Sequence, residues 1–215
     1  MLYGLCHPDW SFFFDTSSTG LFRLLLETVS IALVGTGIGA LIALPLSILN
    51  TPRLVPGPLA AVFQLFVMAV RTIPFFLYGL IFIRVTGPGA FAGVLTLAVC
   101  SVGLLTKRFT EAIEALDFRA YDALAAMGTP FLRRVRFALW PQAAPALRSA
   151  VLYRFDVNIR EASVLGIVGA GGIGAPLVFA MNRYAWPTAG AICLGLVILV
   201  WIVDLLSARA RRHWQ

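Results

Sequence analysis

The chain has 215 residues, of which 60% are hydrophobic and only 13% carry a charge. A soluble domain has about 25% charged and 45–50% apolar residues, so this composition excludes an ordinary water-soluble fold and indicates a membrane protein. The formal net charge of +7 raises the question of nucleic-acid binding, which the positions of the charges answer below.

Five stretches of the chain are long and apolar enough to cross a bilayer as helices, which takes roughly 20 residues each. The second contains Arg71 and Pro74, and the fourth is the least apolar. Turn formers such as Gly87-Pro88-Gly89 separate the stretches. We therefore expect an all-α, polytopic fold with a single transmembrane domain over residues 1–215. The predicted spans cover residues 21–49, 59–85, 90–106, 143–159 and 188–206. Glycines in the first span (Gly35, Gly37 and Gly39) allow close helix packing.

The basic residues gather on one side of this predicted topology. With the N-terminus outside and the C-terminus cytoplasmic, eleven of the 17 Lys and Arg residues fall in cytoplasmic segments. Outer loops then hold only Arg84 and Arg183. This arrangement follows the positive-inside bias of membrane proteins, so the net charge needs no nucleic-acid partner. The cytoplasmic cations are Arg53, the seven between Lys107 and Arg148, Arg209, Arg211 and Arg212.

The segment between the third and fourth spans predicts a helical hairpin on the cytoplasmic side. Residues 117–127 are rich in Ala, and Gly128 suits a left-handed helix end. Thr129 then fits an N-cap and Pro130 the first position of a second helix, which stops before Pro141. That helix carries Arg133, Arg134 and Arg136. From the residues alone, the hairpin either rests on the lipid surface or docks onto another protein.

A motif in this hairpin resembles the EAA motif of ABC importer permeases, which runs Glu-Ala-Ala, three residues, Gly, nine residues and Ile-x-Leu-Pro. The matching segments are Asp122-Ala-Leu-Ala-Ala-Met-Gly128 and Ala138-Leu-Trp-Pro141. Asp122 replaces Glu, Leu124 the second Ala, Ala138 Ile and Trp140 Leu. The resemblance implies a coupling-helix pair, over residues 117–139, that docks on a cytoplasmic ATPase. The implied ATPase-coupling residues are Asp122, Ala123, Gly128, Thr129, Pro130, Arg133 and Pro141.

Residues 152–160 (LYRFDVNIR) and 162–174 (ASVLGIVGAGGIG) resemble permeases of the phosphonate type. The Arg71-Thr-Ile-Pro-Phe75 segment is similar to the methionine-type permeases, which usually have five spans. Phosphonate-type permeases often have one more span at the N-terminus, so either a five-span form or a shortened start is expected. The resemblance implies the type I ABC importer permease fold in the inner membrane. It also implies three partners: a second copy of the chain (a homodimer), a cytoplasmic ATPase dimer, and an external substrate-binding protein.

Several ionisable residues lie within the predicted spans, where charges are costly and often functional. Arg71 lies in the second span, and Arg154, Asn158 and Arg160 in the fourth. Asp156 and Arg160 are four residues apart and can instead form a structural pair. A phosphonate is doubly anionic near neutral pH and suits bidentate guanidinium contacts. We therefore predict that Arg71, Arg154, Asn158 and Arg160 line a translocation path for phosphonate or a related phosphorus oxyanion.

The sequence offers no set of residues for catalysis, for a metal or for a cofactor. Gly169-Ala-Gly171-Gly-Ile-Gly174 satisfies the GxGxxG pattern, but a membrane span precedes it and no acidic residue follows at the expected distance. We interpret it as a tight outer turn. The chain is therefore expected to be a transport subunit and not an enzyme, with ATP hydrolysis on a separate subunit. A stand-alone secondary transporter and a membrane enzyme are the competing classes.

Overall fold

The computed structural model describes residue 9 and residues 20–214, and every regular element in that part of the chain is helical. The side chains of Arg211 and Arg212, which the sequence places in the cytoplasm, lie outside the described part, as do residues 1–8 of the N-terminus. The elements are α3 (Leu21–Leu49), α4 (Gly57–Thr72), α5 (Phe75–Thr86), α6 (Ala90–Glu114), α7 (Arg119–Ala126), α8 (Phe131–Arg134), the π turn η1 (Val135–Leu139), α9 (Trp140–Ile167), α10 (Gly174–Asn182) and α11 (Trp186–Trp214).

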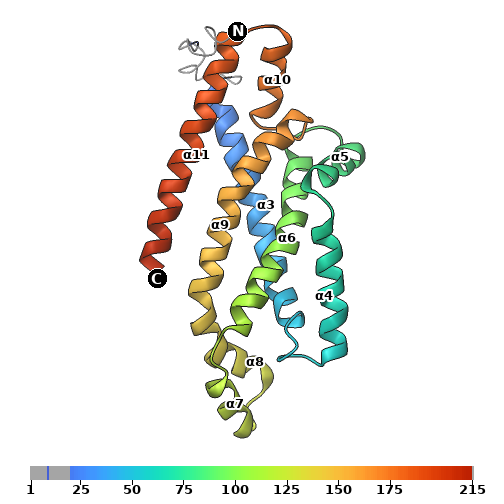
Figure 1. The fold of residues 1–215 in the computed structure, drawn as a ribbon, viewed down its shortest axis with the longest axis vertical. Helices are drawn as coiled ribbons and strands as arrows, with labels where there is room; N and C mark the ends of the chain where they lie inside the picture. Colours follow the sequence, from blue (N-terminus) through green and yellow to red (C-terminus); the bar gives the residue numbers. More distant parts are fainter. Residues whose placement is uncertain (1–8, 10–19, 215) are drawn as a thin grey trace.

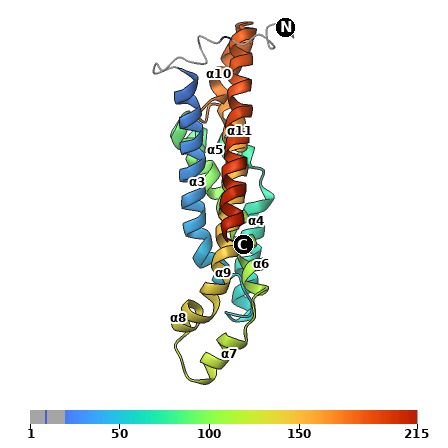
Figure 2. The ribbon, with the colours of Figure 1, turned by 90° about the vertical axis from the view of Figure 1, so that its left-hand side faces the viewer.

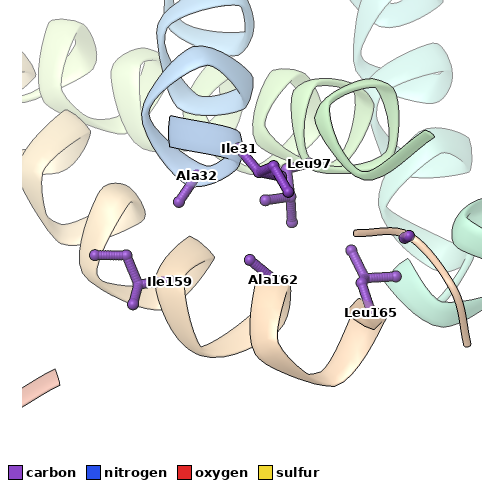
Figure 3. Close-up of a cluster of buried hydrophobic side chains, with 7 residues drawn as sticks. Ile31, Ala32, Leu97, Ile159, Ala162 and Leu165 are labelled. Atoms are coloured by element: carbon purple, nitrogen blue, oxygen red, sulfur yellow. The ribbon is translucent and has the colours of Figure 1, made fainter. Parts of the chain in front are cut away.

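Three long helices, α3, α6 and α9, run side by side through the centre of an elongated bundle (Figures 1 and 2). Their common core contains Ile31 and Ala32 of α3, Leu97 of α6, and Ile159 and Leu165 of α9 (Figure 3). All five are at most 3% exposed. Apolar side chains also cover the outside of the bundle, as lipid contact requires.

Small residues on α3 set its close approach to α6. A Cβ built on Gly35 would lie 2.8 Å from Cβ of Leu97, and one built on Gly39 would meet Ser101. Gly37 lies on the opposite side, with no atom within 4 Å of its built Cβ. Two of the three glycines that the sequence marks for helix packing therefore face α6, spaced four residues apart, as in membrane helix pairs that pack through small residues.

The predicted second span is divided into α4 and α5, whose axes differ in direction by 83°. The break falls at Ile73 and Pro74, where the backbone is extended. Proline lacks an N–H donor and disfavours helical backbone in the residue before it, so the helix ends there. The sequence treats residues 59–85 as one stretch, whereas the structure redirects the chain halfway along it.

Three described helices are long and apolar enough to cross a membrane, namely α3, α6 and α11, and the bent pair α4–α5 is a fourth candidate. Helix α9 lies among them in Figure 1 but is outside this group. The residues that make it polar are Arg148, Arg154, Asp156, Arg160 and Glu161. The count of five spans therefore stays a prediction, although four of the predicted spans each lie within one described helix.

Candidate functional site

At one end of the bundle, α7 and α8 form the predicted helical hairpin (Figures 1 and 2). Helix α7 closes with Gly128, whose φ of +75° is left-handed. The N–H of Gly128 donates to the carbonyl of Ala125, and that of Thr129 donates to the carbonyl of Leu124. This pair of bonds is the Schellman motif, and it places Gly128 at the position that the sequence predicts.

The second helix of the hairpin differs from its prediction at both ends. It begins at Phe131, so Pro130 and not Thr129 lies at the N-cap position, and no side chain caps it. It also does not stop before Pro141. The helical backbone continues through η1 into α9, and the N–H of Trp140 donates to the carbonyl of Val135, five residues back. Such a π turn widens the helix where the proline ring would otherwise collide with the carbonyl four residues earlier.

The hairpin is fixed to the bundle by a small core and by stacked arginines. Its core contains Ile113, Phe118, Tyr121 and Leu139, all less than 9% exposed. The guanidinium of Arg53, in the loop after α3, lies 4.1 Å from the centre of the Phe118 ring. The same group forms a 3.6 Å ion pair with Asp122. The acidic residue of the predicted motif is thus tied to the loop between α3 and α4, although both partners remain more than half exposed.

The start of the hairpin carries a local turn at Asp117. The backbone N–H of Arg119 donates to Oδ1 of Asp117 at 2.9 Å, and the guanidinium of Arg119 lies 3.1 Å from the other carboxylate oxygen. The backbone hydrogen bond is the main reason why the pKa of Asp117 is below its ordinary value. This carboxylate therefore stabilises the first turn of α7 at neutral pH and ceases to do so as the pH falls through its lowered pKa.

The hairpin exposes large apolar side chains. Met127 is 78% exposed, Leu132 80% and Phe137 67%. Asp122, Ala123 and Arg133 are also exposed on the hairpin. Exposed apolar residues that are mixed with charges on a well-ordered turn are typical of a protein-docking surface.

Within the bundle, polar side chains from three helices meet at one crossing. Nδ2 of Asn158 donates to Oγ1 of Thr36 at 2.6 Å and to Oγ of Ser101 at 2.9 Å. Nε of Arg154 donates to the same Ser101 oxygen at 3.1 Å, and its terminal nitrogens pair with Glu161. We call these five residues the crossing cluster. Arg154 and Asn158 are at most 4% exposed, and their hydrogen bonds join α3, α6 and α9.

The four residues that the sequence assigns to a path are not brought together. Arg154 and Asn158 belong to the crossing cluster. Arg160 faces α11, where it pairs with Asp204 at 3.6 Å. Arg71 is exposed near the end of α4, and its side chain lies over Gly103 of α6. Among the described residues, no hydrogen bond or ion pair joins Arg71 to the crossing cluster.

Arg71 lines a polar cleft of about 360 Å³ between α4 and α6. Residues at helical spacing from Gln64 to Arg71 form one wall, and those from Lys107 to Glu114 form the other. Asn50, which follows α3, also lines the cleft. The charges of the cleft are thus separate from the crossing cluster.

The glycine-rich turn at residues 169–174 allows close packing between helices, in line with its interpretation from the sequence as a tight turn. Gly169, Gly171 and Gly172 all have positive φ. The N–H of Gly172 donates to Glu27 of α3, and that of Ile173 donates to Thr28. A side chain at Gly171 would collide with the backbone at the start of α6. The turn therefore fastens α9 and α10 to α3 and α6 at the end of the bundle opposite the hairpin.

Glu161, Ser101 and Thr36 of the crossing cluster are absent from the sequence-based assignment of site residues. A signal for Glu161 exists, because residues seven apart lie on the same face of a helix, and Arg154 and Glu161 have that spacing and opposite charges. Ser101 and Thr36 give no such signal. Isolated hydroxyls in apolar helices commonly bond to their own backbone, as Thr36 also does to Ala32.

Comparison with known proteins places most of the chain in one family. A family model described as "Binding-protein-dependent transport system inner membrane component" matches residues 35–214. The phosphate-import permease protein PhnE of Mycolicibacterium smegmatis is 34% identical over 92% of this chain. The phosphite transport system permease protein PtxC of Stutzerimonas stutzeri is 33% identical over 90% of this chain. The chain spans 37% of the length of the first relative and 70% of that of the second.

The fold also matches a solved structure. A chain of the MetNI methionine ABC transporter, solved in inward-facing conformations, superposes with a TM-score of 0.79. The match covers 91% of this chain and 96% of that chain, at 24% sequence identity. At this identity the likeness concerns the fold, and it supports the all-α permease architecture expected from the sequence.

Proposed function

The chain belongs to the family of binding-protein-dependent transport system inner membrane components, and from this membership we propose that it is the membrane-spanning permease subunit of an ATP-driven importer for a phosphorus oxyanion. One observation carries the choice of substrate class. Two relatives that are 33–34% identical over at least 90% of this chain are named for phosphate import and phosphite transport. The methionine transporter shares the fold at lower identity, so methionine is the second candidate.

The proposed subunit works as a homodimer in the inner membrane with an ATPase dimer and an external binding protein. The hairpin supports this assembly, because it presents exposed apolar residues at the end of the bundle where Arg53, Arg133 and Arg136 also lie. A surplus of cations at that end favours its placement in the cytoplasm, with the N-terminus outside. Asp122, Ala123, Gly128, Thr129, Pro130, Arg133 and Pro141 are the proposed coupling residues.

Arg71 is the proposed path residue with the most suitable surroundings. It lines an open cleft and has a guanidinium that suits a phosphorus oxyanion. Arg154, Asn158 and Arg160 already bond to protein groups, so their proposed contribution is to hold the helices around the path. Replacing Arg154 or Asn158, which are both buried, would leave the groups that they bond to without a partner inside the bundle, and this is costly.

The proposal is tested by reconstituting the permease with its cognate ATPase and binding protein in liposomes. We expect ATP-dependent uptake of phosphite or phosphonate and no competition by methionine. Gly128→Pro removes the N–H that closes α7, so it should abolish both ATPase co-purification and uptake. ATP-dependent methionine uptake would identify the second candidate. Uptake by the permease alone, without ATP, would indicate a stand-alone transporter and overturn the proposal.

A further inference from the structure

The loop between α3 and α4, residues 50–56, is attached to the hairpin by two neighbouring side chains. The guanidinium of Arg53 lies 4.1 Å from the centre of the Phe118 ring and forms a 3.6 Å ion pair with Asp122. The next residue, Leu54, packs against the buried core of the hairpin. Both contacts cross from the loop to the hairpin, so a movement of the hairpin displaces the middle of the loop.

The beginning of the same loop is bonded to the bundle and to α4. The N–H of Leu54 donates to the carbonyl of Thr51 at 3.0 Å, which closes a turn around Arg53. Asn50 is buried, and its Nδ2 donates to Oγ1 of Thr110 on α6 at 3.0 Å. Nε2 of Gln64, on α4, donates to the backbone carbonyl of Asn50 at 3.2 Å. The loop thus has bonds or contacts to the hairpin, to α6 and to α4.

Helix α4 is bounded by a break at each end and is weakly fixed between them. The loop precedes it, and the 83° change of direction at Ile73 and Pro74 follows it. Of its 16 residues, only Ala60 and Val67 are buried, seven residues apart on one face. A helix with breaks at both ends and few buried side chains moves as a rigid unit when one end is displaced.

A movement of α4 changes the place of Arg71, which lies in the last turn of this helix. Cγ of Arg71 is 2.8 Å from the Cβ position built on Gly103, so the arginine stem lies directly against α6. On the α6 wall of the polar cleft, Lys107 and Glu111 form an ion pair at 3.6 Å within one helix. The two walls therefore belong to separate rigid units, and a tilt of α4 carries Arg71 past the charges of α6.

We propose that the loop at residues 50–56 transmits movements of the hairpin to α4, and that Arg53 is the positioning residue that holds the loop to the hairpin. An ATP-driven movement of the hairpin then tilts α4 about the break at Pro74 and shifts Arg71 relative to α6. The inference rests on the proposed function and adds to it a connection that bypasses the crossing cluster. Without Arg53, the hairpin moves but α4 follows it less.

The contacts of Arg53 contribute little to the stability of the fold, which makes the residue suitable for a test. The side chains of Arg53 and Asp122 are 57% and 63% exposed. Exposed ion pairs and exposed cation–π contacts are both weak in water. Variants at position 53 should therefore assemble and melt like the wild type, and a loss of transport in them does not come from misfolding.

The test uses the importer reconstituted in liposomes from permease, ATPase and binding protein, and it measures the phosphite taken up per ATP hydrolysed. We expect Arg53→Gln to lower this ratio about threefold or more, with unchanged melting temperature and unchanged ATPase co-purification. Arg53→Lys keeps a charge near Asp122 but stacks less well on Phe118, so its ratio should be intermediate. Arg119→Gln is the matched control, because it removes a hairpin cation whose 3.1 Å ion pair with Asp117 stays within the hairpin. It should keep the wild-type ratio.

A pair of spin labels follows the movement of α4 directly. The labels are attached at Leu65→Cys on α4 and Leu104→Cys on α6, both exposed positions, after the three native cysteines are replaced by alanine. Excess unlabelled permease ensures that the measured distances lie within one protomer. Pulsed electron paramagnetic resonance of the complex should show a shift of this distance between the nucleotide-free and ATP-bound states. In Arg53→Gln the shift should be smaller, and in Arg119→Gln it should match the wild type.

The outcomes separate this inference from the proposed function. A wild-type ratio and a wild-type distance shift in Arg53→Gln would overturn the transmission role, although the importer itself would stand. Loss of ATPase co-purification in Arg53→Gln would assign Arg53 to docking and overturn the inference as well. If the complex imports methionine and no phosphite, the proposed substrate class fails, and the same ratio measured with methionine decides the role of Arg53. Uptake without ATP would overturn both the proposed function and the inference.

Discussion

Arg154 donates two hydrogen bonds, of 3.2 and 2.8 Å, to the two carboxylate oxygens of Glu161, which lies two turns further along α9. The side chain of Arg154 is 4% exposed and that of Glu161 is 19% exposed. Ser101 of α6 accepts a third hydrogen bond from the guanidinium. The pair itself lies within α9 and the Ser101 bond ties it to α6. Breaking such a buried charge pair on one side only is expensive.

We predict that Glu161→Gln destabilises the permease by about 3–5 kcal/mol, because it leaves the buried charge of Arg154 without its partner. The double variant Arg154→Met with Glu161→Gln removes both charges and should be more stable than Glu161→Gln alone. The measurement is the temperature at which the detergent-solubilised protein loses its monodisperse elution peak. Destabilisation in the double variant equal to the sum of the two single effects would show that the pair is not coupled.

The variant Arg71→Met can be compared with Arg154→Met in the same thermal-stability measurement. The side chain of Arg71 lines an open cleft and lies outside the crossing cluster. We therefore expect Arg71→Met to elute and melt like the wild type but to lower uptake, whereas Arg154→Met should lower thermal stability first. Loss of assembly in Arg71→Met would contradict its assignment to the path.

Substitutions at Gly128 should weaken ATPase binding in steps that follow the strain of left-handed backbone. Its φ is +75°, and the position is open, with no atom within 4 Å of a built Cβ. Gly128→Ala should therefore cost only the strain of left-handed backbone, about 1–2 kcal/mol, and Gly128→Asn less. The amount of ATPase that co-purifies should decrease in the order Gly, Asn, Ala. Gly37→Ala, at an open helical position with ordinary φ, is the control. A full loss of ATPase binding in Gly128→Asn would refute an effect of backbone strain alone.

A substitution at Gly93 of α6 should, in contrast, strongly disrupt the packing of the bundle. A Cβ at this position would lie 2.5 Å from the carbonyl oxygen of Ala170 and 3.1 Å from Cγ2 of Ile31. Because the nearest atom belongs to backbone, Gly93→Ala must move the glycine-rich turn away from α6. We expect a much lower melting temperature than for Gly37→Ala. Equal melting temperatures for the two variants would show that the turn is free to move.

The sequence predicts the helical class and the hairpin well because local rules dominate there. Gly128 is the clearest case of such a local rule. A glycine between two short helical segments predicts a left-handed helix end, and Gly128 has this conformation. Four of the predicted spans fall on α3, α6, α9 and α11, and α3, α6 and α11 are apolar enough to cross a membrane, whereas α9 is not. The continuation of the hairpin through η1 into α9 was not predicted. A proline such as Pro141 normally indicates a helix end. The π turn that lets the helix continue past it has no recognisable sequence pattern.

The assignment of path residues shows where sequence reasoning reaches its limit. The sequence assigns both Arg71 and Arg154 to the path, because each is an arginine within a predicted span. Their different roles depend on Ser101 and Glu161, which pair with Arg154, and on Gly103, over which Arg71 extends. The contacts of Arg154 with Ser101 and of Arg71 with Gly103 arise from packing between helices that are distant in sequence, so no local pattern reveals them. Only the Arg154–Glu161 pair, seven residues apart on α9, leaves a signal in the sequence.

Leu132 and Leu139 provide a matched test of the docking surface, because they lie seven residues apart in the second arm of the hairpin. Leu132 is 80% exposed at the tip, whereas Leu139 is 2% exposed in the core beneath it. We predict that Leu132→Ala leaves the melting temperature of the permease unchanged, since exposed substitutions usually alter stability by less than about 0.5 kcal/mol. The same variant should reduce the ATPase that co-purifies. Leu139→Ala should cost the permease about 2–5 kcal/mol.

The two leucine variants together separate a docking role from a folding role. If the ATPase contacts the tip, its loss in Leu132→Ala occurs without any change in permease stability. If instead the hairpin lies on the lipid surface, Leu132→Ala should leave the co-purified ATPase unchanged and weaken only the binding of the isolated hairpin peptide to vesicles. A lower melting temperature in Leu132→Ala would indicate that Leu132 packs against a second copy of the chain. Each result assigns the exposed leucine to one neighbour: ATPase, lipid or a second copy of the chain.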